Sequence, residues 1–239
     1  MSAPAATAVA WAGADPYAAA LRAGRGPLFL RRADGWLLPL EVERWCARAD
    51  AVDRDVLDRC EGTVLDVGCG PGRLVAELAS RGRSVLGIDV SEAAVEHTVR
   101  LGGRALRRSV FEPLPGEGRW GTVLLMDGNI GIGGDPRALL DRVARLLRPG
   151  GLLIAETAPV EVDERVPVRI TDGRAGAGAP FPWARLGTRA LLAHARGWDP
   201  AARWTADGRR FAALRTRPGH GAEPPDRGAV IGGPRTRDT

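Results

Sequence analysis

The sequence contains no lysine and no glutamine, so all 34 of its Lys and Arg residues are arginines. A Walker A phosphate loop, a pyridoxal Schiff base and a lysine general base all require lysine, and all three are therefore excluded. The formal net charge is +5, but the arginines are scattered among acidic residues instead of forming a stripe. This pattern favours a solvated mixed surface over a nucleic-acid partner.

Cysteines and long apolar runs are also scarce. The three cysteines, Cys46, Cys60 and Cys69, include no CxxC pair, and their odd number argues against a disulfide scaffold or a zinc ribbon. We therefore expect no bound metal. No apolar run approaches the roughly 20 residues that a membrane-spanning helix needs, and the amino end lacks the pattern of a secretory signal. These absences predict a cytoplasmic protein with no membrane partner.

The chain is long enough for one domain of ordinary size with appendages, since 44% of its 239 residues are hydrophobic. Residues 1–16 are Ala-rich and aperiodic, which predicts a disordered tail. Residues 17–62 are expected to form an N-terminal hairpin and helical cap. Residues 63–217 are expected to form the main domain, and residues 218–239, rich in Pro, Gly and Arg, a second disordered tail.

The N-terminal region has the pattern of a β-hairpin. Two apolar runs, at residues 28–30 and 36–38, flank an Asp-Gly turn. Pro39 would confine the second strand to the edge of a sheet. Two short helices are expected next, near residues 42–48 and 51–60.

The middle of the chain alternates apolar strand patterns with helical ones. Strands are predicted at residues 63–68, 84–89, 104–110, 122–127 and 152–156, and helices at 71–81, 91–101 and 135–147. Such alternation predicts βαβ units, and hence an α/β fold with a doubly wound, mostly parallel sheet and helices on both faces. Right-handed crossovers place the ligand crevice at the carboxyl ends of the strands.

The last third of the chain is less regular. Residues 162–170 alternate like a strand, and residues 173–183, rich in Gly and Pro, are expected to form a loop. A helix is predicted at 184–196. Residues 201–205 and 211–216 flank an Asp-Gly turn, which predicts an antiparallel C-terminal hairpin.

The most informative stretch runs from Val64 to Leu74 and reads VLDVGCGPGRL. A strand leads into a glycine loop, which leads into a helix. Gly68 and Gly70 allow a tight turn and the close approach of a ligand, and the helix start presents N–H groups that suit an anion. Asp89 ends the next strand, where a carboxylate can accept both hydroxyls of a ribose. Together they predict a ligand with a nucleoside and an anionic group.

Two cofactor classes fit such a loop. The dinucleotide fingerprint G-x-G-x-x-G would place its third glycine at Arg73, whose side chain resists close packing over a pyrophosphate. An NAD-dependent oxidoreductase is therefore disfavoured but stays open as an alternative. The segment resembles instead the first motif of the class I S-adenosylmethionine-dependent methyltransferases, an acid, one residue and then G-x-G-x-G. The resemblance extends from about residue 63 to residue 158 and includes the Arg-Pro-Gly-Gly before the last apolar strand.

The resemblance implies a Rossmann-like, seven-stranded sheet and S-adenosyl-L-methionine as the cofactor. In that family the glycine loop borders the methionine part of the cofactor, and the acid at the Asp89 position binds the ribose. Ser109 stands where many members carry an acid that receives the adenine amino group, and a hydroxyl can accept the same hydrogen bond. The cofactor site is therefore expected to include Asp66, Gly68, Cys69, Gly70, Gly72, Asp89, Val90, Ser109 and Val110.

The candidate acceptor site is the loop Met126–Asp135, which in this topology lies beside the transferred methyl group. Asp127 would orient or deprotonate an acceptor, and Asn129, the only asparagine of the chain, would hydrogen-bond to it. Both residues could instead only cap and form a turn. Aromatic residues that would line an apolar acceptor pocket are Trp36, Phe181 and Trp183.

These features predict an enzyme that transfers a methyl group from S-adenosyl-L-methionine to a small-molecule acceptor. The candidate loop lacks the [DNS]-P-P-[YF] motif of DNA amino-group methyltransferases, and the chain has no Pro-Cys pair for C5-cytosine chemistry. Both absences disfavour a nucleic-acid acceptor. A protein that binds the cofactor without transferring its methyl group stays open as an alternative, because no histidine is positioned as a general base.

Overall fold

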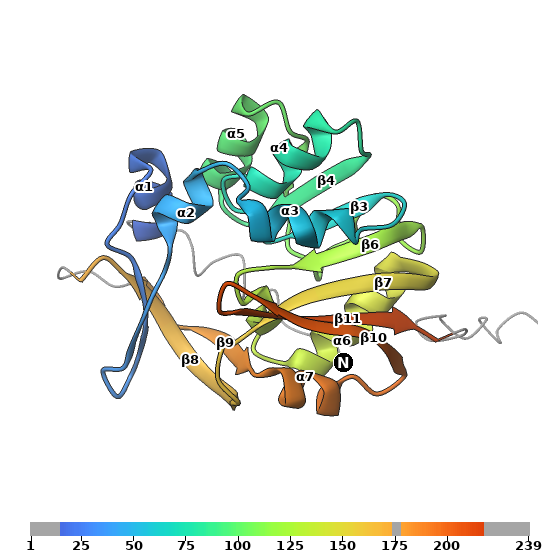
Figure 1. Ribbon diagram of the computed structural model, residues 1–239. Helices are drawn as coiled ribbons and strands as arrows, with labels where there is room; N and C mark the ends of the chain where they lie inside the picture. The colour runs from blue at the N-terminus through green and yellow to red at the C-terminus, as the bar shows by residue number, and fades with distance from the viewer. Residues whose placement is uncertain (1–14, 174–177, 218–239) are drawn as a thin grey trace, which may run out of the picture.

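The computed structural model describes residues 15–173 and 178–217, so most of both predicted tails lies outside the described residues. A seven-stranded sheet forms the centre of the molecule (Figure 1). From edge to edge it contains β10 (Trp198–Ala206), β11 (Arg209–Thr216), β7 (Leu147–Thr157), β6 (Trp120–Leu125), β3 (Val64–Val67), β4 (Val85–Asp89) and β5 (Ala105–Arg107). This order confirms the predicted α/β fold.

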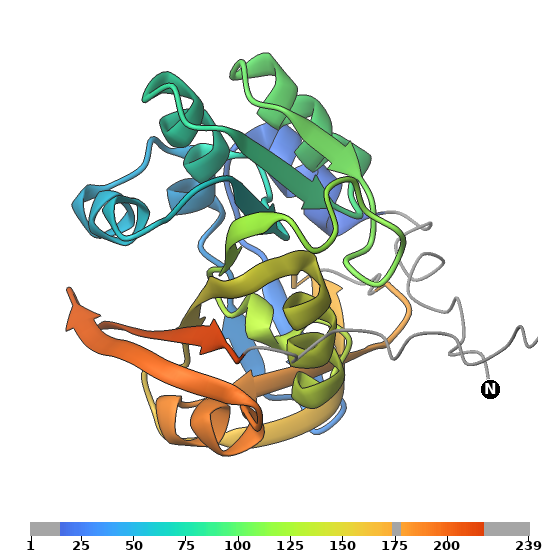
Figure 2. The same ribbon diagram turned by 90° about the vertical axis from the view of Figure 1, so that its right-hand side faces the viewer.

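Five of these strands are parallel, and the C-terminal hairpin completes the sheet. β7, β6, β3, β4 and β5 pair in parallel, whereas β11 is antiparallel to both β7 and β10. β3 and β6 are buried along their whole length. Such strands read as continuous apolar runs because both faces of a parallel sheet are covered. Figure 2 shows the β10–β11 hairpin extending from the sheet, as predicted.

Helices cover both faces of the sheet. The side chains of α3 (Ala51–Asp58) and α4 (Arg73–Ser80) share one apolar cluster with one face, and those of α6 (Pro136–Leu146) and α7 (Thr188–His194) share another with the opposite face. α5 (Glu92–Arg100) packs on β4 and β5. Asp135 caps α6 as predicted, because its carboxylate accepts hydrogen bonds from the first N–H groups of the helix.

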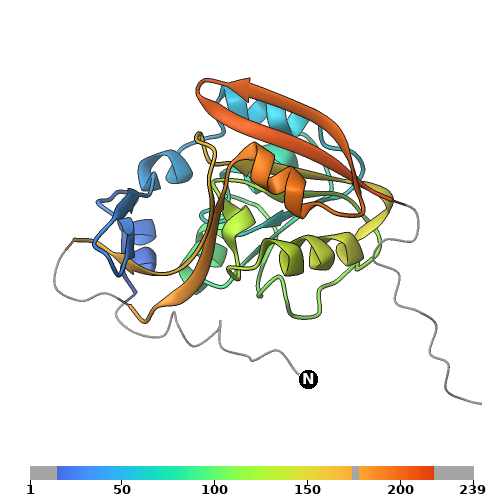
Figure 3. The ribbon, with the colours of Figure 1, turned by 90° about the horizontal axis from the view of Figure 1, so that it is seen from below.

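A second, four-stranded sheet stands beside the carboxyl end of the first. It contains, in spatial order, β2 (Leu37–Pro39), β1 (Phe29–Arg32), β8 (Asp163–Thr171) and β9 (Phe181–Leu186). The β1–β2 hairpin and the edge position of β2 confirm the prediction. The pairing of β1 with β8, which places Leu30 opposite Ile170, was not predicted. It joins segments more than 130 residues apart in the sequence (Figure 3).

Two sequence predictions are wrong in this part of the chain. Residues 181–186, predicted as loop and helix, form strand β9, and the helix is confined to Thr188–His194. Phe181 and Leu186 are buried in different apolar clusters, so burial and pairing with β8 override the local pattern of a loop followed by a helix. In addition, helix α1 (Pro16–Ala23), which begins at the last residue of the predicted tail, was not predicted.

Helix α1 forms because its ends are well capped. Asp15 accepts hydrogen bonds from the N–H groups of Tyr17 and Ala18, and Gly24 ends the helix in the left-handed conformation. Leu21 of α1 packs in one apolar cluster with β1, β8, β9 and α2 (Val42–Cys46). α1, α2 and the second sheet therefore form a cap beside the glycine loop. Within residues 15–173 and 178–217, no helix is long and apolar enough to cross a membrane.

Candidate functional site

Residues 68–72 connect β3 to α4 at the carboxyl end of the central sheet. Gly68, Gly70 and Gly72 all have positive φ, at 71°, 54° and 88°, which side chains other than glycine rarely adopt. A Cβ atom on Gly68 would lie 2.6 Å from Nδ2 of Asn129, so neighbouring side chains also exclude one. Helix α4 begins at Arg73, two residues later than predicted, because Gly72 occupies its N-cap.

Asp89 lies at the end of β4 and closes the loop. Its Oδ2 accepts a hydrogen bond from the N–H of Gly70 at 3.0 Å, and its Oδ1 accepts one from the N–H of Ser91 at 2.8 Å. Burial raises the pKa of Asp89 to about 6, although these N–H groups favour the charged form. The structure thus brings the acid and the glycine loop into direct contact.

Tyr17 of α1 covers the loop from the cap. It is the only tyrosine of the chain, and a Cβ on Gly70 would lie 3.4 Å from its hydroxyl oxygen. Its ring packs edge-on against Trp45 of α2, with ring centroids 6.4 Å apart. Burial, with Asp89 adding to it, raises the pKa of Tyr17, so the hydroxyl stays protonated. Sequence reasoning missed Tyr17 because α1 was not predicted.

Arg73 occupies the position where a dinucleotide-binding loop would have its third glycine. The side chain is 4% exposed, and its guanidinium donates to Asp53 at 2.8 Å and to Asp127 at 2.8 Å. Asp53 is completely buried. Burial alone would raise its pKa, but hydrogen bonds from Arg73 and Arg209 hold the pKa at about 2. The arginine therefore anchors α4 to α3 at the base of the loop.

The ion pairs continue on both sides of Arg73. On one side, Arg209 donates to Asp53 at 2.9 Å and to both oxygens of Glu156 at 2.8 Å. On the other side, Arg44 of α2 donates to Asp127 at 2.6 Å. We call these three arginines and three acids the ionic network. It links the cap and the β10–β11 hairpin to the carboxyl ends of the central strands.

Asp127 and Asn129, the predicted acceptor-site residues, both make contacts within the protein. Asp127 has a φ of 55°, and its carboxylate lies between Arg44 and Arg73. Burial would raise its pKa, but the two arginines hold that pKa below its usual value. Asn129 begins the 3-10 helix η2 (Asn129–Gly131), and its Nδ2 donates to the carbonyl oxygens of Val67 and Gly68, each at 2.9 Å.

Buried polar atoms with unused hydrogen-bonding capacity border the glycine loop. Within the described part of the chain, four such side-chain atoms there have no hydrogen-bond partner: Arg44 Nη1, Trp45 Nε1, Asp66 Oδ2 and Ser91 Oγ. Burial, opposed by Arg73 and reinforced by Asp127, raises the pKa of Asp66 to about 7. Unsatisfied polar atoms are costly, so their presence together indicates a ligand site.

The remaining predicted cofactor residues follow the carboxyl ends of β3, β4 and β5. The Ser109 hydroxyl accepts a hydrogen bond from the N–H of Phe111 at 3.3 Å, and Val110 is buried. Val90 is half-buried next to Asp89. Cys69 is buried, and burial raises the pKa of its thiol, so it is a packing residue. Among the residues that the structure describes, no three His, Cys, Asp or Glu side chains are grouped to hold a metal ion.

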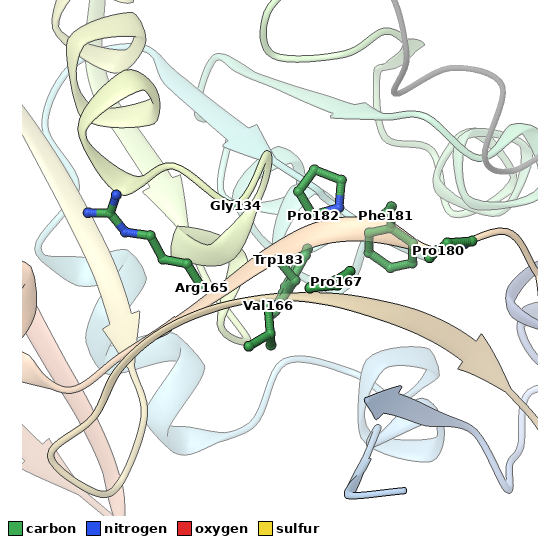
Figure 4. A pocket seen from close by; sticks show the side chains of 8 residues that line it. All are labelled: Gly134, Arg165, Val166, Pro167, Pro180, Phe181, Pro182 and Trp183. Atoms are coloured by element: carbon green, nitrogen blue, oxygen red, sulfur yellow. The ribbon is translucent and has the colours of Figure 1, made fainter. Parts of the chain in front are cut away.

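A pocket of about 310 Å³ lies between the second sheet and the loop before α6 (Figure 4). Two of the predicted aromatic residues, Phe181 and Trp183, line it, but Trp36 does not. Trp36 instead lies beneath the guanidinium groups of Arg185 and Arg32, at 4.7 and 5.6 Å. The pocket is mainly apolar, and its lining residues are Gly134, Arg165, Val166, Pro167, Pro180, Phe181, Pro182 and Trp183.

Comparison with known proteins supports the same part of the chain as the functional unit. Residues 64–151 match a family described as a methyltransferase domain. A ubiquinone biosynthesis O-methyltransferase of Nitrosomonas europaea is 33% identical over 116 residues, which are 46% of this chain and 49% of that protein. The corresponding protein of Pseudomonas paraeruginosa is 36% identical over 104 residues, 40% of this chain and 44% of its own length. The matches thus span about half of the length of these curated relatives, or somewhat less.

A solved structure extends the similarity to the cap. The S-adenosylmethionine-dependent methyltransferase of Bacteroides fragilis, crystallised with S-adenosyl-L-homocysteine, superimposes with a TM-score of 0.71. The superposition covers 85% of this chain and 95% of the other, at 22% sequence identity. At that identity the likeness concerns the fold, and here it includes elements outside residues 64–151.

Proposed function

We propose that this chain is a class I S-adenosylmethionine-dependent methyltransferase that methylates a small molecule. Its fold and its match to a methyltransferase domain at residues 64–151 support the proposal. The observation that carries the proposal is the closed glycine loop. Three glycines with positive φ form a tight loop between β3 and α4, and the buried Asp89 accepts a hydrogen bond from the N–H of Gly70. NAD is not favoured, because Arg73 fills the third glycine position and is held in the ionic network.

The residues at the loop fit S-adenosylmethionine. Asp89 has lone pairs left for the two ribose hydroxyls, since each of its oxygens accepts one backbone N–H. Asp66 Oδ2, which is buried without a partner, suits the ammonium group of the methionine part. Gly68, Gly70 and Gly72 would border that part. When bound, the cofactor supplies an electrophilic methyl group on a sulfonium.

Asp127 and Asn129 would position groups instead of exchanging protons. Asp127 stays ionised between two arginines, so it would hold Arg44 and the loop after β6 in place. Asn129 would fix the backbone of the glycine loop through its two amide hydrogen bonds. Methyl transfer does not always need a strong base, because an in-line orientation of the acceptor supplies much of the rate.

The acceptor would enter the pocket lined by Phe181 and Trp183. The pocket adjoins the loop after β6 through Gly134, and its lining is mainly apolar, as ligand pockets commonly are. A small apolar molecule is therefore the proposed acceptor class. We also propose a cytoplasmic location, which the three free thiols support.

Calorimetric titration tests the cofactor proposal directly. We expect S-adenosylmethionine and S-adenosylhomocysteine to bind the full chain, and NAD not to bind. Binding of NAD alone would contradict the proposal. A screen of small acceptors, begun with phenols because the relatives are named O-methyltransferases, would then separate an enzyme from a protein that only binds the cofactor.

A further inference from the structure

Arg165 of β8 gives the pocket of the second sheet a cationic end. Among the described residues that line this pocket of about 310 Å³, it is the only charged one, and the others are glycine, proline, valine and aromatic residues. In Figure 4 its guanidinium lies at one end of the row of labelled side chains, whereas Pro180 and Phe181 lie at the other. The pocket therefore combines an apolar part with a positive charge at its edge.

His194 of α7 holds the guanidinium of Arg165 in place. Nη2 of Arg165 lies 3.4 Å from Nδ1 of His194, and Nε2 of His194 lies 2.9 Å from Oδ2 of Asp163. When Nε2 donates its hydrogen to Asp163, Nδ1 is an acceptor and receives the hydrogen bond from Arg165. The His194 side chain is only 9% exposed, so it has little freedom to move. The orientation of the guanidinium thus depends on a side chain of another element.

The charge of Arg165 is not neutralised within the protein. Alternate residues of β8 are exposed, so Arg165 and Glu164 lie on opposite faces of the second sheet. On its own face, Glu164 pairs with two arginines, one of which is its cross-strand neighbour Arg185 at 3.2 Å. Arg165 lies opposite Ala184 and, within the described part of the chain, forms no ion pair with a carboxylate. A cation that lines an apolar pocket without a counter-ion indicates a ligand that brings one.

We infer that the acceptor has an apolar ring system and a carboxylate, that Arg165 binds the carboxylate and that His194 positions Arg165. The inference rests on the proposed function and deepens it, because it names the chemical class of the acceptor. Hydrogen bonds from a guanidinium to a carboxylate are charge-assisted, and the planar guanidinium matches the planar carboxylate. One guanidinium balances the single negative charge of a carboxylate, whereas a phosphate monoester carries nearly two charges at neutral pH.

Calorimetric titration with two compounds that differ only in one group tests this assignment. The compounds are 6-hydroxy-2-naphthoate, which has a fused ring system and a carboxylate, and its neutral analogue 6-hydroxy-2-naphthamide. Each is titrated into the full chain saturated with S-adenosylhomocysteine. We expect the unmodified chain to bind the carboxylate about 5-fold more tightly than the amide. This preference is smaller than that of a buried charged hydrogen bond, because Arg165 is exposed.

Three variants separate the role of Arg165 from the charge of the sheet as a whole. Arg165→Gln should bind the two compounds equally, and its affinity for the amide should stay within about 2-fold of that of the unmodified chain. His194→Phe keeps a ring but removes the acceptor for Arg165, so the preference should fall to about 2-fold. Arg169→Gln is the matched control and should keep the full preference. Arg169 is exposed on the same face of β8, but it donates to the carbonyl oxygen of Gly178 at 3.1 Å and does not line the pocket.

Several outcomes would overturn the inference. Equal binding of the two compounds by the unmodified chain, or binding of neither, would show that the pocket does not take an aromatic carboxylate. Loss of the preference in Arg169→Gln would assign it to the overall charge of the sheet face, and an unchanged preference in His194→Phe would refute the positioning role of His194. Failure to bind S-adenosylhomocysteine would refute the proposed function itself. That failure is visible before either naphthalene compound is added, so the two failures are distinguishable.

Discussion

Asp66 and Asp89 are carboxyl groups that the fold buries at the cofactor loop without an ion-pair partner within hydrogen-bond distance among the described residues. Burial raises the pKa of Asp66 to about 7 and that of Asp89 to about 6. When the pKa of an acid is higher in the folded than in the unfolded state, the folded protein loses stability as pH rises from the lower to the higher of the two values. Each pKa unit corresponds to about 1.4 kcal/mol. Both residues therefore destabilise the folded protein near neutral pH, as expected of groups kept for a ligand.

Asp66→Asn should stabilise the protein without ligand at pH 8, because the amide carries no charge to bury. The gain should approach about 4 kcal/mol, the value of three pKa units, and should become small at pH 4. Thermal unfolding at both pH values measures it. The same variant should bind S-adenosylhomocysteine more weakly at pH 8, since the ammonium group loses its anionic partner. Equal effects on stability at the two pH values would contradict this account of Asp66.

Asp89→Ala should weaken binding of S-adenosylhomocysteine severely. Charged hydrogen bonds contribute about 1.5–3 kcal/mol each, so the loss of those to the ribose predicts at least a 10-fold lower affinity by calorimetry. The variant should remain folded, because removing a buried charge offsets the lost hydrogen bonds to Gly70 and Ser91. Unchanged affinity would show that the ribose binds elsewhere.

At the scale of elements, the 3-10 helix η2 couples the loop after β6 to both other parts of the site. Its first residue, Asn129, holds the carbonyl groups of Val67 and Gly68. Its last residue, Gly131, lies against Trp183 of β9, where a Cβ would collide with the indole. The element is thus packed between the cofactor loop and strand β9, which lines the pocket of the second sheet.

Asn129→Ala should lower both cofactor affinity and turnover. Position in the topology alone predicts that only turnover falls, because this loop lies beside the transferred methyl group in the family that the sequence resembles. The two hydrogen bonds to the glycine loop change that expectation, since their loss frees the backbone of Gly68. Titration with S-adenosylhomocysteine should show about a 10-fold loss, the effect of one or two net hydrogen bonds. Normal affinity with lost turnover would contradict this expectation and would show that Asn129 acts at the acceptor site.

At the scale of the whole molecule, the ionic network joins elements that no single βαβ unit brings together. Asp53 comes from α3, Arg73 from α4, Arg209 from β11 and Arg44 from the cap. Buried ion pairs are costly to form but more costly to break, because the remaining partner is left as an unpaired buried charge. The network therefore specifies how the cap and the C-terminal hairpin sit on the central sheet.

Asp53→Asn should destabilise the protein by about 3–5 kcal/mol at pH 7, the cost of breaking a buried pair on one side. The effect should depend on pH. The pKa of Asp53 is about 2 in the folded protein, so its stabilising contribution is complete above about pH 4 and is lost as pH falls towards 2. Denaturant unfolding at pH 7 and at pH 3 measures the destabilisation and its decrease at low pH. Asp55 is an exposed acid of the same helix and serves as the control. Asp55→Asn should change stability by no more than about 0.5 kcal/mol.

The central sheet and its loop were determined by short-range pattern. Continuous apolar runs at β3 and β6, capped helices and glycines at the turn specify their own conformation, because each depends on neighbours in the sequence. The mostly parallel sheet, the tight turn at Gly68 and Gly70 and the position of Asp89 at the end of β4 were therefore predictable, whereas the count of seven strands came from the family resemblance. Two ordinary turn signals likewise located the N-terminal and C-terminal hairpins.

Only the tertiary structure decided how distant segments complete the site. Strand β9 forms because β8 pairs with it, although the local pattern predicts a loop up to residue 183 and a helix from residue 184. Tyr17 covers Gly70 because α1 packs on the second sheet, and Asp127 is held by arginines 83 and 54 positions away in the sequence. Side-chain contacts of this kind depend on which surfaces meet after folding, and no local periodicity records them. The sequence by itself thus determined the cofactor loop, and long-range packing decided which side chains surround it.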